Sequence, residues 1–318
     1  MKIRFGYVST ALSLWEASPS RTMTFTRYKL LGKEERKEKL LALTAENLKN
    51  TLRMLYYNIA HGIELYRLSS SIVPLATHPE ASWDFATPFK DEWLEIGSVV
   101  KKHGLRVSFH PNQYTLFTSP KTEITVNAVR DMEYHYRMFT CMGLERLGTH
   151  NIHVGGAYGD KDAAIGRFHE NIKLLPVHIK EMMTLENDDK TYTTEETLSA
   201  CIRERIPLAF DYHHHMANPS ELPLEDLLPL VFSTWTERPH VPKIHISSPK
   251  SDRLFRAHAD FVDLEFLMPL LKLLKDINQD VDLMIEAKAK DQALLKLVPE
   301  IAAIRGIKRI GGAAVEWK

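Results

Sequence analysis

Short apolar runs, rich in β-branched and aromatic residues, alternate along the chain with longer segments of helical periodicity. Each run has about the length of a buried strand, and near-continuous apolar runs are typical of parallel strands that are covered on both faces. Eight runs occur, at residues 2–9, 63–70, 106–111, 150–156, 183–187, 207–213, 243–248 and 282–287.

Segments in which apolar residues recur every three or four positions separate these runs and predict helices. Clear examples span residues 34–62, 88–104, 125–145 and 264–278. Strands that alternate with helices pair in parallel through right-handed crossovers, and eight such units close naturally into a barrel. The pattern therefore predicts an α/β protein with a single domain, a (β/α)8 TIM barrel over residues 1–318.

The chain shows no sign of a second domain, because no Pro- or Gly-rich linker divides its 318 residues. The connection between the first strand and the first helix, residues 16–33, is unusually long for this architecture. Loops of that length are often functional, so a function is expected for this connection.

Composition narrows the functional classes. Hydrophobic residues make up 44% of the chain and charged residues 26%, as in soluble globular proteins. Lysine plus arginine and aspartate plus glutamate each total 41, so no overall positive field indicates a nucleic-acid partner, and DNA binding would need a local patch. Two cysteines, no signal peptide and no long apolar stretch predict free thiols and a cytoplasmic protein without a membrane partner, associated with the nucleoid if prokaryotic.

The 15 histidines are the compositional anomaly. Catalytic residues of TIM barrels lie where the strands end, at the carboxyl-terminal face. Imidazole and carboxylate side chains recur at or just beyond the ends of the predicted strands. These candidate ligands are His78, His110, His153, Glu186, Asp211, His214, His245, His258 and Glu286. Any one of them alone could simply bond loop backbone, so the prediction depends on their recurrence.

The stretch PLAFDYHHHM, residues 207–216, is the densest example. It runs from a predicted buried strand directly into an aspartate and three histidines. In an extended chain, His213 and His215 flank the candidate ligand His214 and point away from it. We therefore expect Asp211 and His214 to contribute ligands and their neighbours to face elsewhere.

Converging carboxylates in a pocket of low dielectric repel one another, and divalent cations remove that repulsion. Mixed nitrogen and oxygen donors without cysteine suit Mn²⁺, Zn²⁺, Co²⁺ or Fe²⁺. Nine candidate ligands exceed what one ion takes, so we expect a cluster of two or three divalent metal ions. Clustered ions suit the hydrolysis of phosphodiesters.

Two further features are compatible with DNA binding. Gln113 and Tyr114, in the stretch PNQY after a candidate ligand, could enter a duplex as a wedge, or they could form an ordinary turn. Lys250, Arg253 and Arg256 precede His258 and could neutralise phosphates, or they could be an ordinary solvated loop.

Several motifs together resemble the UV damage endonuclease family over nearly the whole chain. They are FGYVS, RLSSSIVPLATHP, FHPNQY, HNIHVGG, LENDD, FDYHHH, PKIHISSP, RAHADF and MIEAKAK, in this order. The resemblance implies a barrel related to endonuclease IV and a DNA repair enzyme that acts on damaged double-stranded DNA. It implies a metal-dependent nick immediately 5′ to cyclobutane pyrimidine dimers and 6-4 photoproducts, which leaves a 3′-hydroxyl and a 5′-phosphate. Manganese is the usual metal of that family.

The resemblance also implies roles for single residues. The catalytic set would be Glu186, Asp211, Glu286 and Lys243. Lys243 would act as a carbamate bridge or an electrostatic stabiliser, Gln113 and Tyr114 as the probing pair, and Tyr7 as a wall of the lesion pocket. At Thr10 and Ala11 the chain departs from the family pattern, where a polar contact to the flipped lesion is expected. No obligate protein partner is implied, and we expect a monomer.

Two rival functions remain open at this point. A metal-dependent sugar isomerase or epimerase uses the same barrel with fewer ligands, and it would have no need of the stretch PNQY. A protein that recognises damage without cutting is the other rival. Metal-dependent nicking of irradiated plasmid separates such a protein from an endonuclease.

Overall fold

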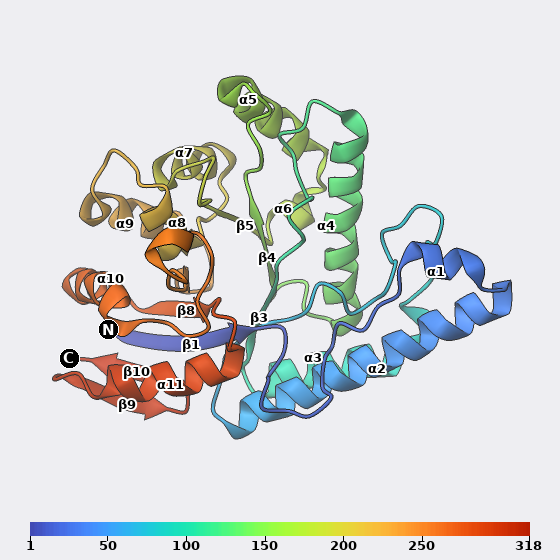
Figure 1. The fold of residues 1–318 in the computed structure, drawn as a ribbon, viewed down its shortest axis with the longest axis horizontal. Helices are drawn as coiled ribbons and strands as arrows, with labels where there is room; N and C mark the ends of the chain where they lie inside the picture. Colours follow the sequence, from blue (N-terminus) through green and yellow to red (C-terminus); the bar gives the residue numbers. More distant parts are fainter.

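Eight parallel strands form a nearly closed barrel in the computed structural model, which describes residues 1–318 (Figure 1). The strands are β1 (Lys2–Val8), β2 (Leu65–Arg67), β3 (Arg106–Phe109), β4 (Thr149–His153), β5 (Met183–Glu186), β6 (Phe210–Asp211), β7 (Lys243–Ile246) and β8 (Val281–Ile285). They pair in the order β5-β4-β3-β2-β1-β8-β7-β6, which confirms the predicted (β/α)8 architecture. Only an isolated bridge between Leu185 and Leu208 links β5 to the segment leading into β6.

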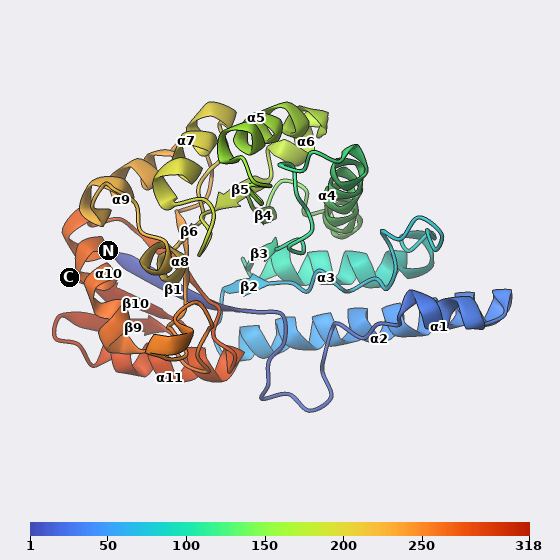
Figure 2. The ribbon, with the colours of Figure 1, turned by 45° about the horizontal axis from the view of Figure 1, so that its top comes forward.

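Helices follow the strands and surround the barrel (Figures 1 and 2). The α-helices are α1 (Phe25–Leu30), α2 (Lys33–Ala60), α3 (Lys90–Lys102), α4 (Thr122–Met142), α5 (Lys161–Asn171), α6 (Val177–Lys180), α7 (Thr194–Glu204), α8 (Tyr212–Ala217), α9 (Leu224–Ser233), α10 (Leu264–Ile277) and α11 (Lys290–Ala302). Three short 3₁₀ turns are η1 (Thr87–Phe89), η2 (Ile172–Leu174) and η3 (Asp252–Leu254). None of the helices combines the length and the apolar character needed to cross a membrane.

The structure differs from the sequence prediction at three places along the chain. A carboxyl-terminal hairpin, β9 (Ile307–Gly311) and β10 (Ala314–Trp317), adds to the sheet antiparallel to β1 and was not predicted. Four of the five residues of β9 are exposed, so the apolar run that marks a buried strand is missing there. The predicted strand over 207–213 shortens to two residues because α8 begins at Tyr212. The long first connection contains the short helix α1.

Charged side chains fill the amino-terminal end of the barrel. Asp282 on β8 accepts hydrogen bonds from Arg4 Nε, at 2.7 Å, and from the guanidinium of Arg106. Asp282 is fully buried and Arg106 is 5% exposed, so this ion-pair group is part of the interior. Lys243, at the start of β7, is also buried there. The opposite end, where the strands finish, is left for the functional site.

A candidate metal centre at the mouth of the barrel

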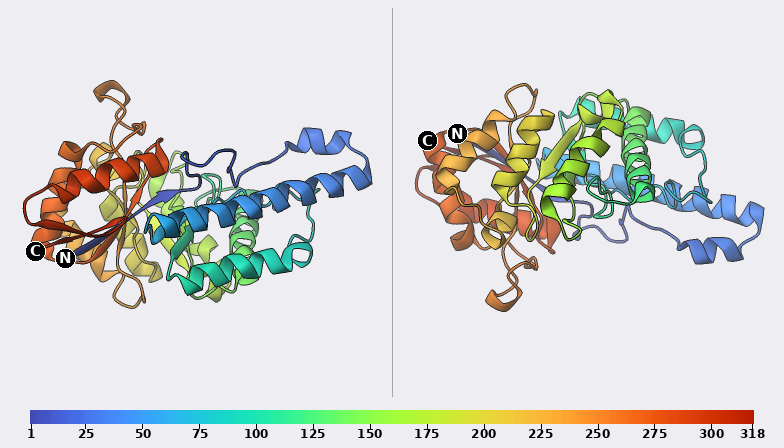
Figure 3. Two further views of the ribbon diagram at one scale, coloured as in Figure 1. Left: turned by 90° about the horizontal axis from the view of Figure 1, so that it is seen from below. Right: turned by 90° about the horizontal axis from the view of Figure 1, so that it is seen from above.

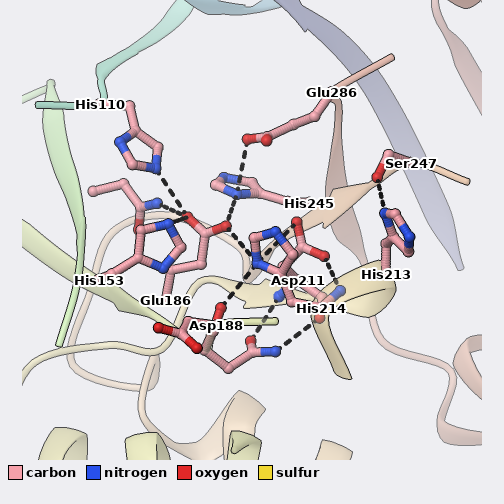
Figure 4. Close-up of polar contacts among 12 residues, drawn as sticks. His110, His153, Glu186, Asp188, Asp211, His213, His214, His245, Ser247 and Glu286 are labelled. Atoms are coloured by element: carbon pink, nitrogen blue, oxygen red, sulfur yellow. Dashed lines mark hydrogen bonds and ion pairs between the residues drawn. The ribbon is translucent and has the colours of Figure 1, made fainter. Parts of the chain in front are cut away.

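Glu186, the last residue of β5, lies at the centre of a cluster of imidazoles (Figure 4). Its Oε2 is 3.1 Å from Nε2 of His110 and 4.0 Å from Nε2 of His153, while its Oε1 is 3.1 Å from Nδ1 of His245. His110 directly follows β3, His153 is the last residue of β4, and His245 lies within β7. Because parallel strands end at the same face, residues far apart in sequence meet around one carboxylate.

A second group of ligand atoms adjoins the first. Nδ1 of His245 is 3.2 Å from Oε1 of Glu286, and Nδ1 of His214 is 3.5 Å from Glu186 Oε1 and 3.8 Å from Asp211 Oδ2. Two sets of potential ligands each have donor atoms within 4.8 Å of one another. They are His110, His153 and Glu186, and Glu186, Asp211, His245 and Glu286. Glu186 belongs to both sets, so it could be shared between two ions.

The three consecutive histidines diverge because they lie on a helix and not on a strand. Asp211 is the N-cap of α8, where its side chain accepts a hydrogen bond from the backbone nitrogen of His214 at 2.7 Å. Successive side chains on a helix point about 100° apart. His214 therefore faces the cluster, while His213 hydrogen-bonds Ser247 at 2.7 Å and His215 hydrogen-bonds the hydroxyl of Thr194 at 2.9 Å. The predicted extended geometry is wrong here, although the outward direction of the two flanking histidines agrees with expectation.

Burial and the imidazoles set the charge of the cluster. Burial alone would raise the pKa of Glu186, but the nearby His245 and His153 hold that pKa well below its usual range. Burial raises the pKa of Asp211 to about 6. Burial alone would lower the pKa of His214, but Asp211 and Glu186 raise it to about 9. The pocket thus concentrates negative charge that only positive partners can compensate.

Three buried polar atoms of the cluster have no hydrogen-bond partner: Glu186 Oε1, Asp211 Oδ2 and His153 Nδ1. Buried polar atoms without partners are rare in native proteins and each requires an explanation. Two of the three are carboxylate oxygens that face imidazole nitrogens. This donor set fits divalent cations that accept both nitrogen and oxygen ligands.

Two of the nine predicted ligands lie at the edge of the cluster or outside it. His258 is close by, since its Nδ1 donates to the carbonyl oxygen of Glu286 at 2.7 Å and its ring centroid is 6.0 Å from that of His214. His78 lies outside both groups, because the loop after β2 stacks its ring on Phe25 at 3.7 Å. Ligation by His78 therefore stays a prediction that this arrangement does not support.

Lys243 and Tyr7, which the family resemblance singled out, occupy different sides of the barrel wall. Lys243 is 2% exposed, and its Nζ has one long contact, 3.5 Å to the hydroxyl of Thr149. Burial lowers the pKa of Lys243 well below its usual value, which favours a neutral amine. The hydroxyl of Tyr7 donates to Asn58 on α2 at 2.8 Å, on the outer face of β1. The structure does not place Tyr7 at the mouth, because odd-numbered residues of β1 face the helices.

The predicted DNA-contacting residues are exposed. Gln113 and Tyr114 line a hollow at the mouth together with His110 and His153, and Tyr114 is 72% exposed. The loop between β7 and α10 carries the three predicted basic residues, Lys250, Arg253 and Arg256, all exposed and none in an ion pair. A bridge between Pro249 and His258 ties the base of this loop to the cluster. Gln113, Tyr114 and the three cations thus lie on the face that carries the candidate ligands.

Sequence reasoning missed two residues that contact the cluster directly. The guanidinium of Arg67, at the end of β2, forms an ion pair with Glu286 and lies 3.1 Å from Nε2 of His245. The side-chain amide of Asn151 on β4 donates to Oε2 of Glu186. The strand-end rule could not have found Arg67 from the sequence, because the predicted run continues to residue 70 whereas β2 ends at Arg67. Alternation along β4 would have found Asn151, because it is two residues before His153.

The chain is similar to known proteins over its whole length. The sequence model described as UV-endonuclease UvdE matches residues 3–318. The chain is 64% identical over 319 residues to a UV DNA damage endonuclease of Bacillus pumilus (strain SAFR-032) and 60% identical over 317 residues to one of Bacillus cereus (strain B4264), with 100% of both chains covered in each case.

Two solved structures share the fold of this chain. The crystal structure of SacUVDE has a TM-score of 0.81 at 30% identity and matches 95% of this chain and 100% of its own. Endonuclease IV from Thermus thermophilus has a TM-score of 0.57 at 13% identity, with 93% of this chain and 98% of that chain covered. At that identity the likeness to endonuclease IV concerns the fold alone.

Proposed function

This chain belongs to the UV-endonuclease UvdE family, and on that premise we propose that it nicks damaged double-stranded DNA by metal-dependent hydrolysis at the barrel mouth. The proposed cut is immediately 5′ to cyclobutane pyrimidine dimers and 6-4 photoproducts, and it leaves a 3′-hydroxyl and a 5′-phosphate. Family membership agrees with the resemblance inferred from the motifs, and it leaves the sugar isomerase or epimerase without support. The observation that carries the proposal is the arrangement of imidazoles and carboxylates around Glu186.

Eight side chains of this arrangement would hold two or three divalent ions, with manganese as the expected metal. They are His110, His153, Glu186, Asp211, His214, His245, His258 and Glu286. When bound, such ions polarise the phosphodiester and allow water to act as a nucleophile near neutral pH. Glu186 would be the shared ligand because its two oxygens face different histidines. Asn151 and the backbone of α8 fix the orientation of Glu186 and Asp211.

Lys243 would support the ligands from below. Burial lowers the pKa of its amine well below the usual value and so favours the neutral form, which is the form that adds to carbon dioxide with release of a proton. The resulting carbamate would add a negative charge under the cluster. As an amine it would instead act only through its electrostatic field.

Recognition would depend on the ease with which a damaged step leaves the duplex. Damage weakens stacking and pairing, so flipping costs less at a photoproduct than elsewhere. The ring of Tyr114 and the amide of Gln113 would fill the gap, a role supported by the exposure of Tyr114 and by the position of both residues beside His110 and His153. Lys250, Arg253 and Arg256 would neutralise the phosphates that approach the cluster.

Elemental analysis combined with a plasmid assay tests the metal and the substrate together. Purified protein should contain at least two equivalents of a divalent metal and should nick UV-irradiated supercoiled plasmid, with no nicking after chelation. Glu186→Gln should lower both the metal content and the rate of nicking. The rate should fall at least about 100-fold, because replacing a residue that only hydrogen-bonds a metal ligand already costs up to about 100-fold in activity. Glu225→Gln on the exposed surface of α9 is the control and should behave as the unchanged protein.

The products and the wedge are tested in the same assay. Polymerase extension of the new 3′ end and ligation to the new 5′ end should succeed without prior processing. Tyr114→Ala should reduce the preference for irradiated over intact plasmid, whereas Tyr56→Ala on α2 should not. A protein that binds irradiated DNA and leaves it covalently closed would only recognise damage, and the proposed hydrolysis would then be wrong.

A further inference from the structure

The connection between β1 and α2 contains an uninterrupted basic stretch, residues 17–33, which we call the basic segment. It carries four cations, Arg21, Arg27, Lys29 and Lys33, and no acidic residue. This bias is notable because the chain as a whole has a formal net charge of zero. The four side chains are exposed and none forms an ion pair. None of the four cations therefore has a direct ionic partner in the protein, although Glu16 precedes the segment and Glu34 and Glu35 follow it.

The basic segment begins at the mouth of the barrel. The hydroxyl of Ser20 is 2.7 Å from that of Ser69, and Ser20 lines the same hollow as His110 and His153. Thr22 lines the neighbouring hollow together with Tyr114. The segment thus starts beside both the candidate metal centre and the proposed wedge.

From the mouth, the basic segment leads away from the barrel. Helix α2 has 28 residues and a length of about 42 Å, whereas β1 has seven residues and a length of about 23 Å. The first buried residue of α2 is Leu40, so its amino-terminal turns are not packed against the barrel. Figures 1 and 3 show α1 and this end of α2 extending well beyond the other helices.

Hydrogen bonds to α2 anchor the basic segment near both of its ends. The side chain of Asn47 on α2 accepts from the backbone nitrogen of Arg21 and donates to its carbonyl oxygen, both at 2.8 Å. Arg36 Nε donates to the carbonyl oxygens of Tyr28 and Leu31 at 3.0 and 2.9 Å. Cations on a fixed backbone can meet a regular array of phosphates at a lower entropic cost than cations on a mobile loop.

We propose that the basic segment binds the phosphate backbone of duplex DNA to one side of the reacting site. This proposal rests on the proposed function, because it takes DNA as the substrate. Duplex DNA carries one negative charge per about 1.7 Å of its axis, so cations on a segment that extends outward from the mouth are opposite in sign to the phosphates that would lie along it. Contacts to phosphates carry no sequence or lesion information, so the segment contributes affinity and orientation and leaves recognition to the mouth.

The test measures DNA binding in EDTA, so that cutting does not contribute. The variant R27Q/K29Q/K33Q is compared with K272Q/K308Q/K318Q, which removes the same charge from exposed positions on α10, on β9 and at the carboxyl end. The first variant should bind irradiated and intact duplexes about 10-fold more weakly at moderate salt and by the same factor for both. Its slope of log affinity against log salt should fall by about 3, one for each phosphate that the variant no longer neutralises.

A hydroxyl-radical footprint then locates the contact. The unchanged protein and the control variant should protect the flank on one side of the lesion, and R27Q/K29Q/K33Q should lose that protection only. Equal affinity, salt slope and footprint for the two variants would overturn the inference while the unchanged protein still nicks irradiated plasmid. Absence of both nicking and DNA binding by the unchanged protein would instead reject the proposed function.

Discussion

Arg67 provides a permanent positive charge that directly contacts one carboxylate of the cluster, that of Glu286. Its guanidinium pairs with Glu286 and also meets an imidazole nitrogen of His245. The Arg67 and Glu286 side chains are only 11% and 14% exposed, so solvent screens the pair weakly. At the scale of single residues, the negative charge of Glu186, Asp211 and Glu286 is therefore only partly neutralised by positively charged side chains.

Arg67→Gln should lower the free energy of unfolding more in EDTA than in excess Mn²⁺. Removing one partner of a buried pair costs about 3 kcal/mol, because it leaves Glu286 uncompensated, and bound cations can take over the compensation. Urea unfolding in both conditions measures the difference. Arg137→Gln, which breaks an exposed pair with Asp84, should cost about 1 kcal/mol or less in both. Equal losses for Arg67→Gln in both conditions would contradict this role.

At the scale of elements, capping interactions at helix ends determine where side chains near the candidate metal centre and on the basic segment point. Asp211 ends β6 and caps α8 within one residue, which turns three consecutive histidines in three directions. Arg36 on α2 caps the other kind of helix end, because its guanidinium donates to carbonyl oxygens at the carboxyl-terminal end of α1. Helix α1 has no buried residue, so its persistence depends on these local contacts.

Arg36→Ala should unfold α1 locally without unfolding the barrel. Loss of the capping hydrogen bonds and of the contact between the guanidinium and the Tyr28 ring, at 4.9 Å, removes the contacts that hold the carboxyl-terminal end of α1 and leaves the stacking of Phe25 on His78 at its start. Limited trypsin digestion should cut after Arg27 and Lys29 several-fold faster, while the free energy of unfolding changes by about 1 kcal/mol or less. Lys37→Ala, which removes a neighbouring exposed cation, should digest at the original rate. Equal digestion of the two variants would show that α1 does not depend on Arg36.

At the scale of the whole molecule, buried histidines make stability depend on pH. Burial lowers the pKa of His150 well below its usual value and that of His213 and His240 to about 4. The unfolded chain binds these protons near pH 6.5, whereas the folded chain does not. At these three histidines the unfolded state therefore holds more protons between about pH 6.5 and 4, so their contribution to stability falls as the pH is lowered through that range.

His150→Leu should raise the free energy of unfolding and weaken its acid dependence. The His150 ring is fully buried against Phe139, and neither ring nitrogen has a hydrogen-bond partner. Removing an unsatisfied buried polar group recovers about 1 to 3 kcal/mol, and the variant no longer takes up that proton on unfolding. Urea unfolding from pH 7 to pH 4.5 measures both effects, with the exposed His103→Gln as control. An unchanged acid dependence would show that His150 is not neutral in the fold.

The sequence by itself determined the barrel and most of the candidate centre. Alternating apolar runs and helical segments fix eight strand-helix units, and the rule that functional residues follow strand ends is local in sequence. Glu186, His245 and Glu286 could therefore be selected without knowing any contact between them. The same local rules placed Gln113 and Tyr114 at the mouth, where the structure also has them.

Only the tertiary structure decided which of these side chains meet. The loop after β2 turns His78 onto Phe25, the pleat of β1 turns Tyr7 toward Asn58, and the start of α8 separates the three histidines. Arg67 reaches Glu286 across 219 positions of sequence. Strand periodicity is set by each residue and its neighbours, but loop paths and side-chain partners are set by packing between distant segments, which no local pattern encodes.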